Sequence, residues 1–94
     1  QKNNIMNILE KANEITNKRS EEKERMYGPF EESMTKAAEI ATLMTSKIIT
    51  TEDMYKCMVA LKLSRESYSH KEDNLLDAVA YLGSLNNFIN NKNN

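Results

Sequence analysis

The chain lacks several features that define whole classes of proteins. Its 94 residues include one cysteine, one proline, two glycines and no tryptophan. A single cysteine cannot form an internal disulfide, and so few glycines leave no glycine-rich phosphate loop. No apolar run approaches the roughly 18 residues that a membrane span needs, and no leader of the secretory type is visible. We therefore expect a cytoplasmic protein without a membrane partner.

Neither sign of charge is in excess. Thirteen basic residues accompany fourteen acidic ones, which gives a net charge of −1 at pH 7. Because acids and bases are interspersed, no broad basic surface is expected that would attract the backbone of duplex nucleic acid. Duplex nucleic acid is therefore not an expected partner.

The length of the chain limits the size of its hydrophobic core. A single domain of 94 residues buries only about 60–65 per cent of its unfolded surface, so a monomer would be marginally stable. We expect a homo-oligomer that completes the core between subunits. The predicted domain covers residues 6–90, with residues 1–5 a tag remnant or linker and residues 91–94 a polar tail.

Helical periodicity dominates the sequence, and no strand-forming run is visible. Apolar residues three and four positions apart predict a first helix with a break near Asn17. Gly28 and Pro29 then form a corner, since glycine tolerates unusual backbone angles and proline suits the first turn of a new helix. A second helix is predicted to follow, with an apolar stripe of Phe30, Met34, Ala37, Ala41, Met44 and Ile48.

Two capping boxes are predicted to start the later helices. Thr50 with Asp53 marks the third helix, and Ser69 with Glu72 marks a fourth that starts near His70. The expected fold class is therefore all-α, a small bundle of about four helices.

The third helix is predicted to bury the lone cysteine. Cys57 lies between Met54 and Met58 in a helical pattern that also places Leu61 and Arg65 on one face. Free cysteine is among the residue types most often buried. We therefore expect Cys57 to be a small buried hydrophobe in a reducing compartment.

The end of the third helix and the start of the fourth hold the main candidate site. Lys62 and Arg65, three residues apart, project close together and face the fourth helix. The planar donor fork of Arg65 suits phosphate oxygens, and Lys62 supplies a second positive charge. In the alternative interpretation, both cations form ion pairs with Asp73 and Asp77 or stabilise the last helical carbonyls.

Polar side chains fall along one edge of the fourth helix, and tyrosines lie nearby. His70, Asn74 and Asp77 follow spacings of four and three residues. Tyr27 or Tyr68 could stack on a nucleobase, although tyrosines more often fill the edge of a bundle. One histidine without a histidine or cysteine partner gives no zinc motif. The predicted ligand-binding residues are Lys62, Arg65, Asn74, Asp77, Tyr27, Tyr68 and His70.

Four segments together resemble a group of small phage-encoded helical domains without assigned function. The segments are R-M-Y-G-P-F at residues 25–30, A-A-E-I-A at 37–41, K-L-S-R at 62–65 and D-N-L-L-D-A-V-A-Y at 73–81. The resemblance implies a phage or prophage origin and expression in a bacterial cytoplasm.

The fourth-helix motif is also similar to that of the MazG-like all-α nucleoside-triphosphate pyrophosphatases. In that family a Glu-x-x-Glu motif on one helix and a Glu-x-x-Asp motif on the next hold Mg²⁺ against a triphosphate. Asp77 matches the final aspartate, but Asn74 stands where the glutamate belongs, and Lys62 and Arg65 replace the preceding acidic pair. Exchanging carboxylates for cations turns attraction for metal into attraction for phosphate.

Three functional hypotheses follow. The leading one is a non-catalytic binder of a nucleotide or other phosphorylated small ligand, without a cofactor, which could sequester a nucleotide signal of host defence. The second is a Mg²⁺-dependent nucleotide pyrophosphatase. The third is a bundle that binds another protein. The second hypothesis needs a rebuilt acidic site with the metal ligands Asp73, Asp77, Glu32 and Glu39.

Overall fold

The computed structural model describes residues 7–18 and 21–92, and within these ranges it is helical without strands. The predicted all-α class is confirmed. The break expected near Asn17 separates a short second helix from the first, so the described ranges hold five helices, four of them long. The helices are α1 (Ile8–Asn17), α2 (Glu21–Tyr27), α3 (Phe30–Thr45), α4 (Thr51–Tyr68) and α5 (Glu72–Lys92).

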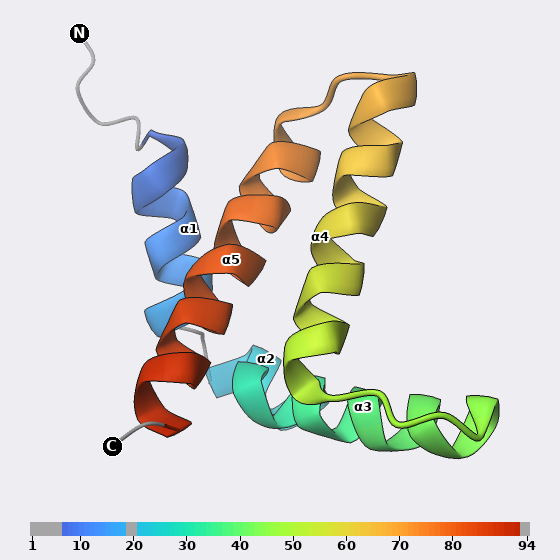
Figure 1. Ribbon diagram of the computed structural model, residues 1–94. Coiled ribbons are helices and arrows are strands. Elements are labelled where there is room, and N and C mark those ends of the chain that lie inside the picture. The colour runs from blue at the N-terminus through green and yellow to red at the C-terminus, as the bar shows by residue number, and fades with distance from the viewer. Residues whose placement is uncertain (1–6, 19–20, 93–94) are drawn as a thin grey trace, which may run out of the picture.

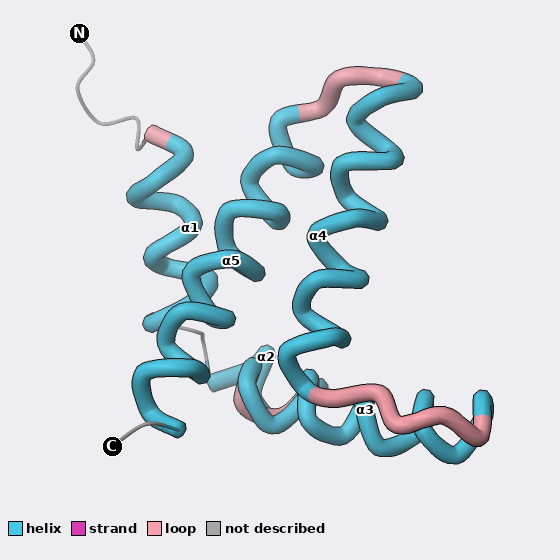
Figure 2. The backbone as a smooth tube through the Cα atoms, viewed as in Figure 1, coloured by secondary structure: helices cyan, strands magenta, loops and turns pink. Residues whose placement is uncertain are grey.

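Helix α5 is the centre of the arrangement. It packs between α1 on one side and α4 on the other, while α3 crosses the end of this layer where α4 begins (Figure 1). The tube in Figure 2 shows that the loop after α3 runs back along that helix before α4 starts. The first part of α3 therefore lies against the bundle, and its last turns extend beyond α4.

Side-chain caps explain where two of the helices begin. The predicted capping box at the start of α4 is confirmed, because Asp53 N donates to Thr50 Oγ1 and Thr50 N donates to Asp53 Oδ2, both at 3.0 Å. A second box, formed by Asn7 and Glu10, starts α1. Each such cap satisfies backbone donors that a helix leaves without partners.

The predicted capping box of Ser69 with Glu72 is wrong. Ser69 ends α4 instead, with its N–H donating to the carbonyl of Arg65 at 3.2 Å, and α5 begins at Glu72. The carboxylate of Glu66 accepts the amide N–H of Lys71 at 3.1 Å, so a side chain from the preceding helix caps this corner.

The core is built around Tyr55, which is fully buried. Its hydroxyl lies 2.7 Å from Ser84 Oγ, and Met34 and Leu85 complete the buried cluster. Ala12 of α1 is also buried, and such a small side chain lets neighbouring helices approach closely. Partly buried side chains surround the cluster: Phe30, Met54, Met58, Tyr81, Phe88 and Ile89.

The prediction that Cys57 is buried is wrong, because its side chain is exposed. Helix α4 turns Tyr55 into the core, and a residue two positions later points to the opposite side of a helix. The face that meets α5 instead carries Tyr55, Met58, Lys62 and Glu66 at spacings of three and four. The residues on either side of Lys62 in the sequence therefore lie on the solvent side of α4.

The apolar stripe predicted for the second helix is correct only in its first half. Phe30 and Met34 pack in the core, whereas Met44 and Ile48 are more than three quarters exposed. Helix α3 ends at Thr45, so Ile48 lies in the following loop. The stripe loses its cover because this end of α3 extends past α4.

The ends of the chain and its polarity add two points. Residues 1–5, predicted to be a tag remnant or linker, lie outside the described ranges, as do residues 93–94. Helix α5 continues to Lys92, two residues beyond the predicted domain end. None of the helices within residues 7–18 and 21–92 is long and apolar enough to cross a membrane.

Candidate functional site

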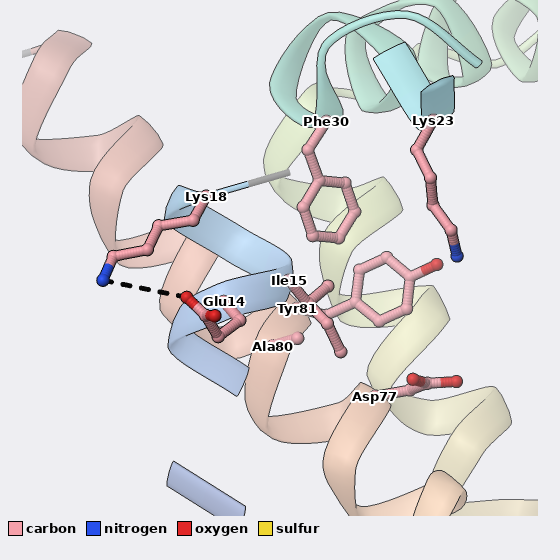
Figure 3. A pocket seen from close by; sticks show the side chains of 8 residues that line it. All are labelled: Glu14, Ile15, Lys18, Lys23, Phe30, Asp77, Ala80 and Tyr81. Atoms are coloured by element: carbon pink, nitrogen blue, oxygen red, sulfur yellow. Dashed lines mark ion pairs between the residues drawn. The ribbon is translucent and has the colours of Figure 1, made fainter. Parts of the chain in front are cut away.

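An open hollow lies where α1, α2, α3 and α5 meet (Figure 3). Its volume is about 350 Å³, which is within the range of small-molecule pockets. Apolar rings form one part of its wall and charged groups form another. The lining residues are Glu14, Ile15, Lys18, Lys23, Phe30, Asp77, Ala80 and Tyr81.

The aromatic part of the hollow is the pair Phe30 and Tyr81. Their ring centroids lie 5.2 Å apart with the planes inclined by 58°. Phe30 reaches this position because it is the first residue of α3, directly after the corner at Gly28, whose φ of +78° suits glycine. Both rings rest on the core yet show part of their surface to the hollow.

Two lysines bring positive charge to the same space. Lys18 follows the end of α1 and pairs with Glu14 at 3.7 Å, an exposed contact one helical turn long. Lys23 extends from α2 toward the hydroxyl end of Tyr81 (Figure 3). The hollow thus places flexible cationic side chains beside flat aromatic surface.

Asp77 closes the hollow on the α5 side and is held by Lys62. The Nζ of Lys62 lies 3.0 Å from Asp77 Oδ2, and the lysine side chain is only 16% exposed. The predicted meeting of Lys62 with Asp77 therefore occurs as an ion pair. The pairing fixes the carboxylate of Asp77 at the edge of the hollow and offsets its charge.

A separate polar cluster lies at the corner between α4 and α5. Glu66 accepts hydrogen bonds from Asn74 Nδ2 at 3.3 Å and from Lys71 N at 3.1 Å, and it pairs with His70 Nδ1. The hydrogen bond from His70, followed by that from Lys71, lowers the pKa of Glu66 below its ordinary value. Predicted ligand residues His70 and Asn74 are therefore engaged in holding a helix corner.

The remaining predicted ligand residues do not meet at the hollow. Arg65 is exposed in the last turn of α4, and Tyr68 is 90% exposed at the end of that helix. The side chain of Tyr27 lies outside the described part of the structure. Of the predicted ligand set, Asp77 is the member that lines the hollow.

The structure does not assemble the predicted magnesium ligands within one chain. Among the described residues, no group of three or more His, Cys, Asp or Glu side chains could hold a metal ion. Glu32 and Glu39 are exposed on α3, because Met34 and Ala38 form the buried side of that helix. Asp73 is exposed in the first turn of α5.

Sequence reasoning missed most of the hollow. Phe30 was recognised only as a core residue, and Lys18 and Lys23 belong to a charged run that carries no motif. Their meeting depends on the break between α1 and α2, which turns the chain so that residues from four helices share one space. A periodic pattern within one helix contains no signal for such a junction.

Fold and site together define a small all-helical domain with an aromatic, lysine-bearing hollow at a helix junction. A family model described as "Domain of unknown function (DUF6378)" matches residues 7–88, so the chain belongs to this family. No curated protein and no solved structure shows significant similarity to the chain.

Proposed function

We propose that the domain binds a nucleotide or a related phosphorylated small molecule in the hollow at the α1, α2, α3 and α5 junction. The observation that carries the proposal is the aromatic pair Phe30 and Tyr81 beside Lys18 and Lys23. Aromatic surface binds the flat face of a nucleobase, and ammonium groups bind phosphate oxygens. Neither kind of group alone would favour this ligand class.

Size and charge support the same ligand class. A volume of about 350 Å³ lies at the small end of ligand pockets and suits one nucleotide unit better than a dinucleotide. Around the hollow, the carboxylates of Glu14 and Asp77 each have a lysine partner, Lys18 and Lys62. The lining holds two lysines, Lys18 and Lys23, beside the two carboxylates, and the flexible stem of a lysine lets its ammonium group turn toward an anionic ligand.

The proposal retains the ligand class expected from the sequence and changes the residues that bind it. Lys62 acts by positioning Asp77 rather than by holding phosphate, and an ion pair at 3.0 Å is the basis for that role. Asp77 would accept hydrogen bonds from the ligand's polar edge. In the cytoplasm of a bacterium infected by phage, such a protein would sequester a nucleotide signal without turnover.

Isothermal titration calorimetry with a panel of mononucleotides and cyclic nucleotides tests the proposal. Lys23→Glu is the first variant, because Lys23 is exposed and its replacement leaves the core intact. We expect at least a tenfold loss of affinity, since reversing one phosphate contact removes roughly 1.5–3 kcal/mol. Tyr81→Leu removes the ring but keeps apolar volume, and stacking on one ring is worth about 1–3 kcal/mol.

Matched controls separate this site from the one expected from the sequence. Arg65→Ala and Tyr68→Ala change an exposed cation and an exposed tyrosine outside the hollow and should leave the affinity unchanged. Absence of binding by every nucleotide, with helical circular dichroism intact, would refute the proposed function. Release of pyrophosphate from a triphosphate with Mg²⁺ would favour the MazG-like alternative instead.

A further inference from the structure

The outward face of α3 exposes an unusual amount of apolar surface. Ile40, Leu43 and Met44 are 50%, 82% and 80% exposed, and Ile48 in the next loop is also exposed. Contiguous apolar surface on a small soluble domain marks an interaction site far more often than isolated exposed residues do. The described residues have a radius of gyration of 14.5 Å, above the roughly 12 Å of a compact domain of this size.

Helical geometry shows that this face is symmetric about Ile40. Lys36 and Met44 lie one turn before and after Ile40, and Ala37 and Leu43 lie three residues to either side. All four fall within about 60° of Ile40 around the helix axis. The core residues Met34 and Ala38 occupy the opposite side, so the face is turned away from the bundle, with Ala37 half-buried at its edge.

The two halves of this face differ in shape. The first half contains an open hollow of about 420 Å³, lined by Gly28, Glu32, Ser33, Lys36, Ala37 and Ile40. The second half carries the projecting side chains of Leu43 and Met44. If a second copy packs antiparallel through Ile40, the projecting side chains of each copy meet the hollow of the other. Such mutual fit is the property of an isologous interface.

The charges at the two ends of the face are complementary in the same way. Glu32 lies on this face in the first turn of α3, and Lys47 lies just after the end of the helix. Antiparallel pairing brings the acidic end of one helix to the basic end of its partner, twice in each dimer. A parallel arrangement would place like charges together and lose this attraction.

We infer that the outward face of α3 is the contact surface of a two-fold symmetric homodimer, with Ile40 at the symmetry axis. The inference is independent of the proposed ligand, because the nucleotide hollow and the hollow on the outward face of α3 share no lining residue. The last turns of α3 project from a single copy, and in the dimer they pack against the partner.

Sedimentation velocity of the full chain tests the dimer. The wild type should sediment as a dimer at micromolar concentration. Leu43→Asp should raise the dimer dissociation constant at least about a hundredfold, because two copies of a buried leucine are lost per dimer. Leu63→Asp on α4, where Leu63 is 49% exposed, is the matched control and should stay dimeric. A monomeric wild type, or a dimer unaffected by Leu43→Asp, overturns the inference.

Charge exchange tests the antiparallel direction. Glu32→Lys and Lys47→Glu should each weaken the homodimer by bringing like charges together. Mixing the two variants should restore association, because the mixed dimer places opposite charges at both contacts. If mixing produces no dimer beyond that of the separate variants, the antiparallel pairing is wrong.

A disulfide tests the symmetry axis. Ile40→Cys in a Cys57→Ser background should form a covalent dimer rapidly on mild oxidation, because residues at a two-fold axis approach their own copies. Glu39→Cys in the same background, one position around the helix, is the control and should cross-link at least tenfold more slowly. Equal rates for the two variants would contradict the proposed axis.

Discussion

The buried hydrogen bond between Tyr55 and Ser84 offers the sharpest test of how the core is held. The tyrosine is fully buried, the serine is 3% exposed, and their oxygens lie 2.7 Å apart. Tyr55→Phe and Ser84→Ala each remove one partner while preserving most of the surrounding volume. Each change leaves the other hydroxyl without this partner at a position with little exposure to solvent, and burial already raises the pKa of Tyr55.

The expected cost follows from the difference between losing one partner and losing both. An unsatisfied buried hydroxyl costs about 1–3 kcal/mol, whereas removing both partners is nearly neutral. We therefore expect Tyr55→Phe to lower the free energy of unfolding by about 1.5 kcal/mol. Ser84→Ala should cost slightly less, because alanine recovers roughly 0.5 kcal/mol of helix propensity within α5. The double variant should be more stable than the sum of the single losses predicts.

Chemical denaturation of the four proteins in this cycle measures the coupling energy. We expect a coupling energy near 1 kcal/mol. In a chain of this length, Tm should fall by about 4–8 °C for each kcal/mol of stability that a variant loses. Unchanged denaturant slopes would show that the unfolded states remain comparable. A coupling energy within about 0.3 kcal/mol of zero would refute the conclusion that this hydrogen bond stabilises the core.

Two other predictions concern the glycines and Glu66. Gly28→Ala should lower the free energy of unfolding by about 1 kcal/mol, because φ there is +78°. Gly83→Ala should raise the free energy of unfolding by about 0.5–1 kcal/mol, because its new methyl group has room within α5. Equal effects of the two variants in urea denaturation would contradict this prediction. Because the folded-state pKa of Glu66 is lowered, its stabilising effect is present above the ordinary value of 4.5 and is lost as pH falls through the folded-state value. Glu66→Gln should flatten the decline of stability below pH 4.5, while Glu39→Gln, the exposed control on α3, should not.

The sequence predicted the elements of this fold better than their rotation. Periodicity and the Thr50 cap gave the helices and the start of α4, because both are local properties. The predicted face of α4 was right at Met54 and Met58, which pack against the core, and wrong at Cys57 and Leu61, which are exposed, because the buried side is centred on Tyr55. The average hydrophobicity of a helix face does not distinguish it from the adjacent face when polar residues are partly buried on that helix.

The candidate site was also predictable only in part. Lys62 and Asp77 were expected to meet, and they do, since both lie on helix faces that pack together in an antiparallel pair. Lys23 and Phe30 could not be placed because their position depends on the turns around α2, where one residue more or less would rotate every later side chain. Local patterns therefore predicted a contact between neighbouring helices but not a junction of four.

Helix α3 connects the two proposals while keeping them separate. Its first residue, Phe30, contributes a ring to the nucleotide hollow, whereas Ile40 and Leu43 lie on the side turned away from the bundle. A charge introduced at Leu43 is therefore far from the ligand along the helix, and a change at Lys23 leaves the outward face untouched. A monomeric Leu43→Asp protein that retains ligand affinity would show that dimerisation serves stability, whereas a joint loss would mean that the dimer positions α3, and with it Phe30, at the hollow.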